Sequence, residues 1–297
     1  MTPLPILPHT PTMRIFLLLL LLVSSAAAQY ATNLELQKGS FLQGEPLLAF
    51  ITITNRSGAD AIVGGIGSRP WLQFQFEDAQ GRQLAPVPIS SREAITLKAG
   101  SSTRHTVEIE GSASTADLGT FYTTASIYHP LSGQYYATNR ARITVTDAKP
   151  MFDESFGVPA GFPQAGRARR YQAIIFRDID AVTLYARIVD DRTQERLSTQ
   201  LLGPIIHSIQ PQMAIDSKNH FHLLFMAQPR LFCHTIVKPD GRIAKRSYYR
   251  DLEGSRPTMI MVKNGAEIVG GEYFDPSKPP PKKGPAIRKA SERPAGL

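Results

Sequence analysis

The pattern that most constrains the fold of this chain is the alternation of apolar and polar residues over short stretches. Ile51 and Ile53, for example, alternate with Thr52 and Thr54, as a strand with one buried face requires. The 3.6-residue periodicity of amphipathic helices is nearly absent, whereas β-branched residues and regularly spaced turn signals are frequent. We therefore predict an all-β protein.

Residues 29–148 are predicted to form the first domain. Gly81 and Gly100 separate stretches of strand character, and glycine supplies the turn conformations that other residues resist. The predicted strands are residues 33–37, 47–55, 71–77, 94–98, 104–110, 120–128 and 141–146. Short strands at this spacing indicate a β-sandwich of two sheets.

Four short motifs give this domain a family resemblance. They are GEP at 44–46, TN at the strand end 54–55, KAG at 98–100 and LGTFY at 118–122. Together they resemble the bacterial immunoglobulin-like modules of envelope proteins, although Ala99 replaces a frequent proline and the paired cysteines of antibody domains are absent. The resemblance covers residues 30–147 and implies an immunoglobulin-like β-sandwich without identifying a ligand.

A segment rich in proline and glycine, residues 149–168, follows and is interpreted as a linker. It carries Phe152, Phe156 and Phe162, an apolar set that a free spacer does not need. We therefore expect it to pack on the second β-region, residues 169–275, with association of two chains as the alternative. Residues 276–297 are rich in proline and lysine, and we expect a disordered tail there.

An internal repeat organises the second region. PQMAI at 211–215 and PTMIM at 257–261 are offset by 46 residues. Between them, residues 231–237 and 242–249 form a predicted hairpin, and residues 184–189 and 197–202 form a similar one about 47 residues earlier. A unit of four strands and this length has the size of a propeller blade.

The first copy also resembles the blades of sialidase-type propellers, which carry an Asp-box-like turn. The matching residues are AIDS at 214–217 and HLLF at 222–225, with Asn219-His220 in place of Gly-Asn. The resemblance covers about two and a half blades, and known single-chain propellers need at least four. We therefore predict a blade-like antiparallel assembly, either a partial propeller or a second sandwich.

The first 28 residues have the features of a cleaved signal peptide. Arg14 precedes a nine-residue apolar run at 15–23, and Ala26 and Ala28 fit the cleavage rule, so the mature chain is expected to begin at Gln29. Nine residues are too few to span a bilayer, which takes about 20. Cys233 is the only cysteine, which favours a secreted or periplasmic protein of a bacterial envelope over a disulfide-rich secreted one.

The net charge of +8 lies mainly in the tail. Residues 276–297 hold six Lys or Arg and one Glu, whereas residues 29–148 have a net charge of −1. A nucleic-acid-binding domain would instead concentrate basic residues on a folded face, so we expect no nucleic-acid partner. The tail is expected either to contact an anionic envelope surface or to act as a solubilising end.

Two histidines and a Cys-His pair are candidate metal ligands. His220 and His222 point to the same side of a predicted strand, and Cys233 and His234 lie on the next one. The strand register decides whether His234 faces the pair. The alternative, which we favour, is that His222 is structural and His220 lies on the surface.

A sialidase-like active site would need acids and arginines converging from several blades. Arg187, Arg230 and Asp216 are available, but Asp216 is better explained as a turn residue that accepts backbone hydrogen bonds. The carboxylate pairs Asp178/Asp180 and Asp190/Asp191 are expected to be solvated turn residues.

Two further motifs carry little chemistry. The glycine-rich segment 64–68 lacks the lysine of a phosphate-binding loop. Asn55 begins a glycosylation sequon, which has meaning only in a eukaryotic source.

The sequence thus predicts a non-catalytic envelope protein that binds another macromolecule, protein or glycan, through its β-domains. No catalytic, cofactor-binding or metal-binding residue is assigned, no cofactor is expected, and no integral membrane segment is expected in the mature chain. Two alternatives remain: a propeller-type carbohydrate-active hydrolase and a secreted protease inhibitor.

Overall fold

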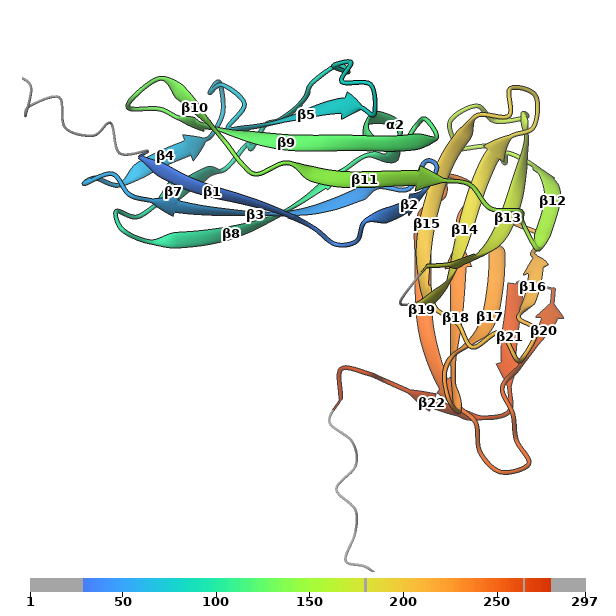
Figure 1. Cartoon of the computed structure of the whole chain (residues 1–297). Coiled ribbons are helices and arrows are strands. Elements are labelled where there is room, and N and C mark those ends of the chain that lie inside the picture. Colours follow the sequence, from blue (N-terminus) through green and yellow to red (C-terminus); the bar gives the residue numbers. More distant parts are fainter. Residues whose placement is uncertain (1–28, 179–180, 264, 279–297) are drawn as a thin grey trace, which may run out of the picture. The chain divides into compact units, whose positions relative to one another are not determined.

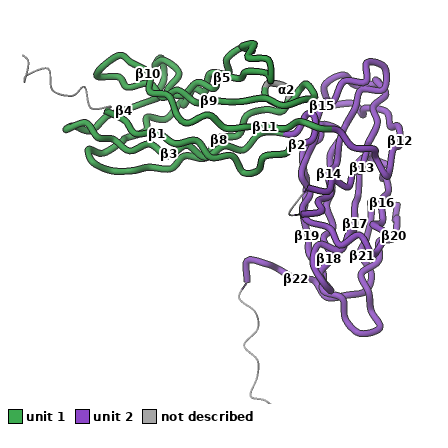
Figure 2. The backbone as a smooth tube through the Cα atoms, in the orientation of Figure 1, with its two compact units in different colours: residues 1–41, 46–146 green, residues 42–45, 147–297 purple. Residues whose placement is uncertain are grey.

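The computed structural model describes residues 29–178, 181–263 and 265–278, and it confirms an all-β protein. The predicted signal peptide and all but the first three residues of the predicted tail lie outside this range. The chain forms two compact units, residues 1–41 with 46–146 and residues 42–45 with 147–297 (Figure 2). One four-residue helix, α2 (Gly111–Ser114), interrupts the strands of unit 1 (Figure 1).

Unit 1 is built from antiparallel sheets. One has the order β1-β3-β8, and a larger one has the order β2-β11-β9-β5-β6, with β10 also pairing with β9 and β4 pairing with β7. The strands are β1 (Tyr30–Leu36), β2 (Ser40–Leu42), β3 (Leu47–Asn55), β4 (Ala61–Gly64), β5 (Leu72–Asp78), β6 (Val87–Ile89), β7 (Ala94–Leu97), β8 (Ser102–Ile109), β9 (Gly119–His129), β10 (Gln134–Ala137) and β11 (Ala141–Thr146).

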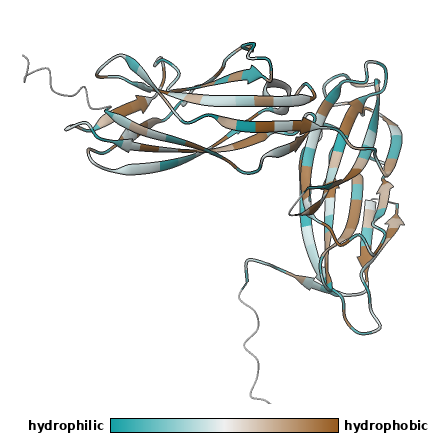
Figure 3. Cartoon of the chain, in the orientation of Figure 1, coloured by the Kyte–Doolittle hydropathy of each residue, from teal (hydrophilic) through white to brown (hydrophobic). Residues whose placement is uncertain are grey.

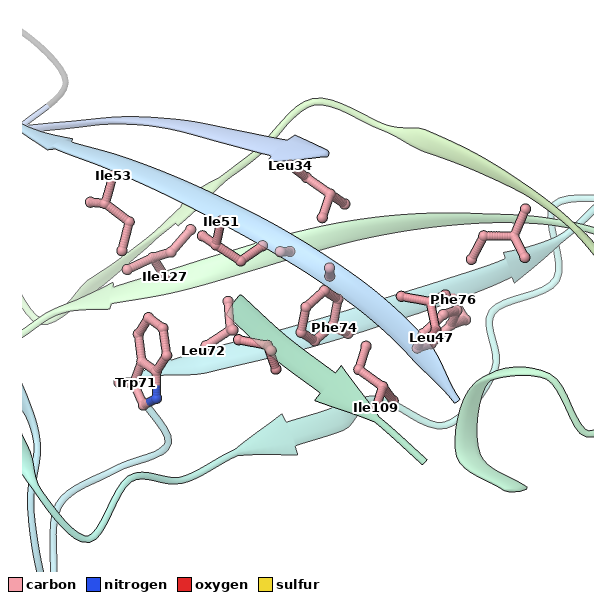
Figure 4. Close-up of a cluster of buried hydrophobic side chains, with 14 of the residues drawn as sticks. Leu34, Leu47, Ile51, Ile53, Trp71, Leu72, Phe74, Phe76, Ile109 and Ile127 are labelled. Carbon is pink, nitrogen blue, oxygen red and sulfur yellow. The ribbon is translucent and has the colours of Figure 1, made fainter. Parts of the chain in front are cut away.

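The core of unit 1 lies between these sheets. Ile51 and Ile53 from β3 point toward Leu72 and Phe74 of β5 and toward Ile127 of β9, and all of these side chains are buried (Figure 4). The alternating pattern of β3, in which every second residue is buried, therefore follows directly from its two-faced sequence.

Unit 2 contains two meanders of antiparallel strands and one separate hairpin. The first sheet has the order β12-β13-β14-β15, the second has the order β16-β17-β18-β19-β22, and β20 pairs only with β21. The strands are β12 (Phe152–Gly157), β13 (Ala168–Arg177), β14 (Val182–Asp190), β15 (Arg196–Pro204), β16 (Gln212–Ile215), β17 (Phe221–Gln228), β18 (Leu231–Val237), β19 (Ile243–Arg250), β20 (Thr258–Val262), β21 (Gly265–Val269) and β22 (Glu272–Phe274).

The structure corrects the interpretation of residues 149–168 as a linker. Residues 152–157 form β12, which pairs with β13 along its whole length. The glycines and prolines that suggested a linker lie mostly in the β12–β13 connection, so they shape a turn and leave β12 intact. Phe156 is buried in the core of unit 2, and Phe152 and Phe162 pack against that core, as expected of this apolar segment.

Residues 268–274 do not form one continuous strand. They divide into the end of β21 and the whole of β22, because Gly270 and Gly271 have φ values of +74° and +68°. A Cβ atom at Gly271 would lie 2.7 Å from the carbonyl oxygen of Arg250, so only glycine fits this bend. The bend carries β22 away from β21 to pair with β19.

Each meander buries apolar residues on both faces. One cluster joins Tyr171 and Leu184 of the first sheet to Phe221 and Leu223 of the second. On the other side of the second sheet, Leu224 of β17 belongs to a cluster that receives Met259 and Ile268 of the β20–β21 hairpin. The hairpin thus covers this side of the second sheet.

Candidate functional site

The turn between β16 and β17 is organised by Asp216. Its Oδ1 atom accepts the backbone N–H groups of Lys218 at 2.9 Å and His220 at 2.8 Å. Asn219 completes the turn with a φ of +60°, a conformation that asparagine tolerates well. The predicted role of Asp216 as a turn residue is confirmed.

The second carboxylate oxygen of Asp216 begins a chain of side-chain contacts. Asp216 Oδ2 lies 3.2 Å from His220 Nδ1 and 3.2 Å from His222 Nε2. His222 Nδ1 in turn lies 3.2 Å from His234 Nε2, and the two imidazole rings are stacked. We call Asp216, His222 and His234 the imidazole relay.

The strand register explains why the relay forms. His234 is opposite Leu224, and Leu224 lies on the same face of β17 as His222 because it is two residues further on. The register that sequence analysis left open therefore places His234 with the histidine pair. His222 and His234 are only 3% and 5% exposed, whereas the His220 side chain is partly exposed.

Burial and hydrogen bonding set the protonation of the relay. Burial alone would raise the pKa of Asp216, but the N–H groups donated by His220, His222 and Lys218 hold that pKa below its usual value. Burial, reinforced by His222 and Lys245, lowers the pKa of His234 to about 4. At neutral pH the relay is therefore an ionised carboxylate followed by an imidazole, His234, that resists protonation.

Hydrogen-bond donors and acceptors match along the relay in one arrangement. An ionised Asp216 only accepts, so His222 donates from Nε2; in the tautomer in which His222 Nδ1 carries no proton, that atom accepts from His234 Nε2. In that arrangement both hydrogen bonds, from His222 to Asp216 and from His234 to His222, have a donor and an acceptor. The Asp216 carboxylate and the two imidazole rings therefore contact one another in sequence inside unit 2.

The candidate metal ligands are brought together only in part. Cys233 lies opposite Phe225 in the core between the two meanders, on the other face from His234, and burial raises the pKa of its thiol. Within residues 29–178, 181–263 and 265–278, no three His, Cys, Asp or Glu side chains are placed to share a metal ion. The metal alternative gains no support from this geometry.

The residues considered for a hydrolase active site contact different partners in different parts of unit 2. Arg187 is buried in the first meander, where it donates to Asp147 at 2.8 Å, and it also lies near Thr199. Arg230 occupies the β17–β18 turn with a φ of +61° and donates to the backbone of Asp251. Each of these groups already has a structural partner.

The remaining motifs have structural explanations. Asp190 is buried and accepts the N–H groups of Arg192 and Thr193, so it is a turn residue but is not solvated. Residues 64–68 form the end of β4 and a turn, and Asp180 lies outside the described residues. The Asn55 side chain is buried and donates to the backbone of Leu97, so this sequon is closed to glycosylation in the folded chain.

The β20–β21 hairpin is the feature that sequence analysis did not identify as a site. Its outer face carries exposed apolar side chains, with Ile260 at 41%, Val262 at 36% and Val269 at 42% exposure. Figure 3 shows hydrophobic colours on parts of both strands. Soluble proteins rarely leave several such residues together on a surface without a partner.

The hairpin also has an open edge. The Met259 backbone N–H donates to Gln212 Oε1 at 2.7 Å, so it points away from β21. In an antiparallel pair the opposite residue, Ile268, then points its N–H away from β20, and Ala266 does the same two residues earlier. In the described part of the chain no strand pairs with β21 on that side.

Comparisons with known proteins do not place the chain in a family. No family model and no curated protein matches it. The solved structures that resemble it include the sporulation control protein Spo0M from Bacillus subtilis, at 8% identity over 57% of this chain and 83% of that chain, with a TM-score of 0.30. A β-glucosidase from Listeria innocua matches at 16% identity over 41% of this chain and 16% of that chain, with a TM-score of 0.27. The DNA glycosylase AlkC from Pseudomonas fluorescens matches at 16% identity over 43% and 33%, also with a TM-score of 0.27. TM-scores this low identify no family and support no function.

No helix in the described part of the chain has the length and hydrophobicity needed to cross a bilayer.

Proposed function

We propose that this chain is an exported, non-catalytic interaction protein, and that it binds an extended strand of another polypeptide at the open edge of β21. The proposal combines an immunoglobulin-like first unit with a second unit whose meanders are copies of one blade-like repeat. It assigns the chain to a bacterial envelope, on the basis of the signal-like residues 1–28 and the single cysteine.

The observation that carries the proposal is the position of β21 within the repeat. In both meanders the second strand pairs with a third one, as β13 does with β14 and β17 does with β18. β20 begins 46 residues after β16, where the first strand of a third copy would begin. β21 begins near the position of that copy's second strand, which would correspond to β17. Within residues 265–278, the described part of the chain from β21 onward, no third or fourth strand of such a copy follows, and β22 pairs with β19.

The chemistry of the edge fits strand addition. Outward-pointing backbone groups at Ala266 and Ile268 provide hydrogen bonds to an added strand, and the neighbouring Val269 provides apolar contact. Edges of this kind are usually blocked by proline, a bulge or a covering loop. β21 has no proline, and its single charged residue is Glu267.

The binding test uses the third strand of the preceding meander as its probe. A peptide with the β18 sequence LFCHTIV, with serine for cysteine and a lysine added at each end, should bind saturably in fluorescence anisotropy at pH 7. The control peptide carries proline at alternate positions, which removes its hydrogen-bond donors. Equal binding of both peptides, or of neither, would refute strand addition.

Two variants test whether the β18 peptide binds at the edge of β21. Ala266→Pro removes one outward N–H group, and Val269→Asp places a charge on the outer face without changing the backbone. Each should weaken binding of the β18 peptide at least tenfold. The matched control is Ile62→Asp in unit 1, a residue that is 59% exposed on β4, and its affinity should equal that of the wild type.

A further inference from the structure

A single charged residue lies at the centre of the open edge of β21. Glu267 is the only charged residue of the strands β20 and β21, and its side chain is exposed. It stands between Ala266 and Ile268, whose backbone groups point outward. Across the hairpin Glu267 is opposite Ile260, an apolar residue that cannot neutralise a carboxylate. A strand added at this edge therefore meets one negative charge on the outer face.

The basic residues that flank the two strands do not compensate this charge. The Arg256 guanidinium lies 5.4 Å from the centroid of the Phe232 ring, in the cluster that the hairpin covers. Lys263 lies in the turn, beyond the last strand pair of Val262 with Gly265. Among the residues that the structure describes, none forms an ion pair with Glu267. The added strand is thus the natural source of a positive charge.

A second copy of β21 would be a poor partner for this edge. In antiparallel pairing, the register that uses the outward groups of both Ala266 and Ile268 places Ala266 of one copy opposite Ile268 of the other. It also places Glu267 directly opposite Glu267, and like charges in that position destabilise a strand pair. A shift by two residues removes this repulsion but leaves only one hydrogen-bonded residue pair within β21.

A basic side chain satisfies both features of the outer face. Its charged end reaches the carboxylate of Glu267, directly across the strand pair. Its aliphatic stem extends toward the diagonal neighbour Val269, which is 42% exposed and apolar. Lysine and arginine are the residues that combine a positive end with such a stem.

We propose that the strand bound at β21 carries lysine or arginine opposite Glu267, and that Glu267 selects the partner by this pair. The inference rests on the proposed function, because it specifies which strands the open edge accepts. The partner is a different polypeptide with a basic residue in an extended segment, and a second copy of this chain is excluded from the edge.

The repeat supplies the register for a test. With β20 aligned on β16 at the 46-residue offset, Glu267 takes the place of His222. His222 is opposite Ile236 of β18. When the β18 peptide takes the place of a third strand beside β21, its residue at the position of Ile236 is therefore opposite Glu267.

The experiment compares three versions of the β18 peptide, with lysine, glutamine or glutamate in place of Ile236. Fluorescence anisotropy at pH 7 and low ionic strength should give the tightest binding for lysine and the weakest for glutamate. Opposite charges across a strand pair change the affinity by about 1.5- to fivefold, and like charges act in the other direction. The lysine and glutamate peptides should therefore differ at least about twofold. Salt at about 1 M should remove the difference by screening.

Protein variants assign the preference to Glu267. Glu267→Gln should bind the three peptides alike, and Glu267→Lys should reverse their order. The matched control is Glu195→Lys, which gives the chain the same net charge from an exposed position between β14 and β15. This control should keep the wild-type order, which separates a strand pair from general attraction by the net charge.

The outcomes separate this inference from the proposed function. Equal affinity of the wild type for the lysine and glutamate peptides, or an unchanged order in Glu267→Lys, would overturn the inference and leave strand addition intact. Failure of every peptide to bind would overturn the proposed function and this inference with it. In sedimentation of the full chain, a dimer that Ala266→Pro dissociates would contradict the exclusion of a second copy.

Discussion

Removing the carboxylate of Asp216 is the perturbation with the clearest structural consequence. Asp216→Ala deletes the acceptor of two backbone N–H groups and of the His222 ring N–H. The Nε2–H group of His222 is buried and would be left without an acceptor, although His222 Nδ1 would keep its contact with His234. Breaking a buried, charge-assisted network by removing one member costs about 3–5 kcal/mol. We expect Asp216→Ala to destabilise unit 2 by that amount.

Asp216→Asn separates the two roles of the side chain. Its amide oxygen can still accept the N–H groups of Lys218 and His220, but its NH2 group would face the N–H of His222. His222 and His234 must then change tautomer together to keep their link. We expect a cost of about 1–3 kcal/mol, the usual range for losing a hydrogen bond to a charged group.

The measurement is urea denaturation at pH 7, with unit 2 followed by pulsed hydrogen exchange of peptides from β17 and β18. The single tryptophan, Trp71, lies in the core of unit 1, and its fluorescence shows that this unit stays folded. Asp216→Ala should be the least stable protein, Asp216→Asn should be intermediate, and the wild type should be the most stable. A cost below about 1 kcal/mol for Asp216→Ala would contradict the assignment of the relay as a buried, charge-assisted network.

Three further outcomes are expected. Phe221→Ala, within the aromatic stack of unit 2, should cost about 3–5 kcal/mol in chemical denaturation, whereas the exposed Leu252→Ala should change stability by less than about 0.5 kcal/mol. Gly241→Ala should lower the melting temperature more than Gly81→Ala, because both have positive φ but only the first Cβ would collide, at 2.4 Å from a neighbouring serine. Mass spectrometry of the protein from its native host should find Gln29 at the N-terminus, and an intact signal-like segment would exclude export by cleavage.

Much of the strand pattern could be predicted because the alternation of apolar residues is a local signal. The ranges 47–55, 141–146 and 231–237 coincide with β3, β11 and β18. The short strands β4 and β10 were missed because their sequences, AIVG and QYYA, do not alternate apolar and polar residues. β12 was missed because the glycines and prolines around it mark the turn that follows it.

The imidazole relay could be predicted only in part. The turn role of Asp216 follows from a local pattern of residue types, and the pairing of His220 with His222 follows from their spacing. The meeting of His222 with His234 depends on the register between two strands, which a one-residue shift reverses. The open edge of β21 could not be read from the sequence either, because it results from β22 pairing with β19.

The central claim, that β21 offers a free edge to an added strand, is tested most directly by residue-resolved amide exchange with and without the β18 peptide at pH 7. The Glu267 amide should be protected in both samples, since it pairs with Ile260 of β20. The amides of Ala266 and Ile268 should exchange rapidly in the free protein and slowly once the peptide is bound. Protection of Ala266 and Ile268 in the free protein, or no change with saturating peptide, would contradict the account.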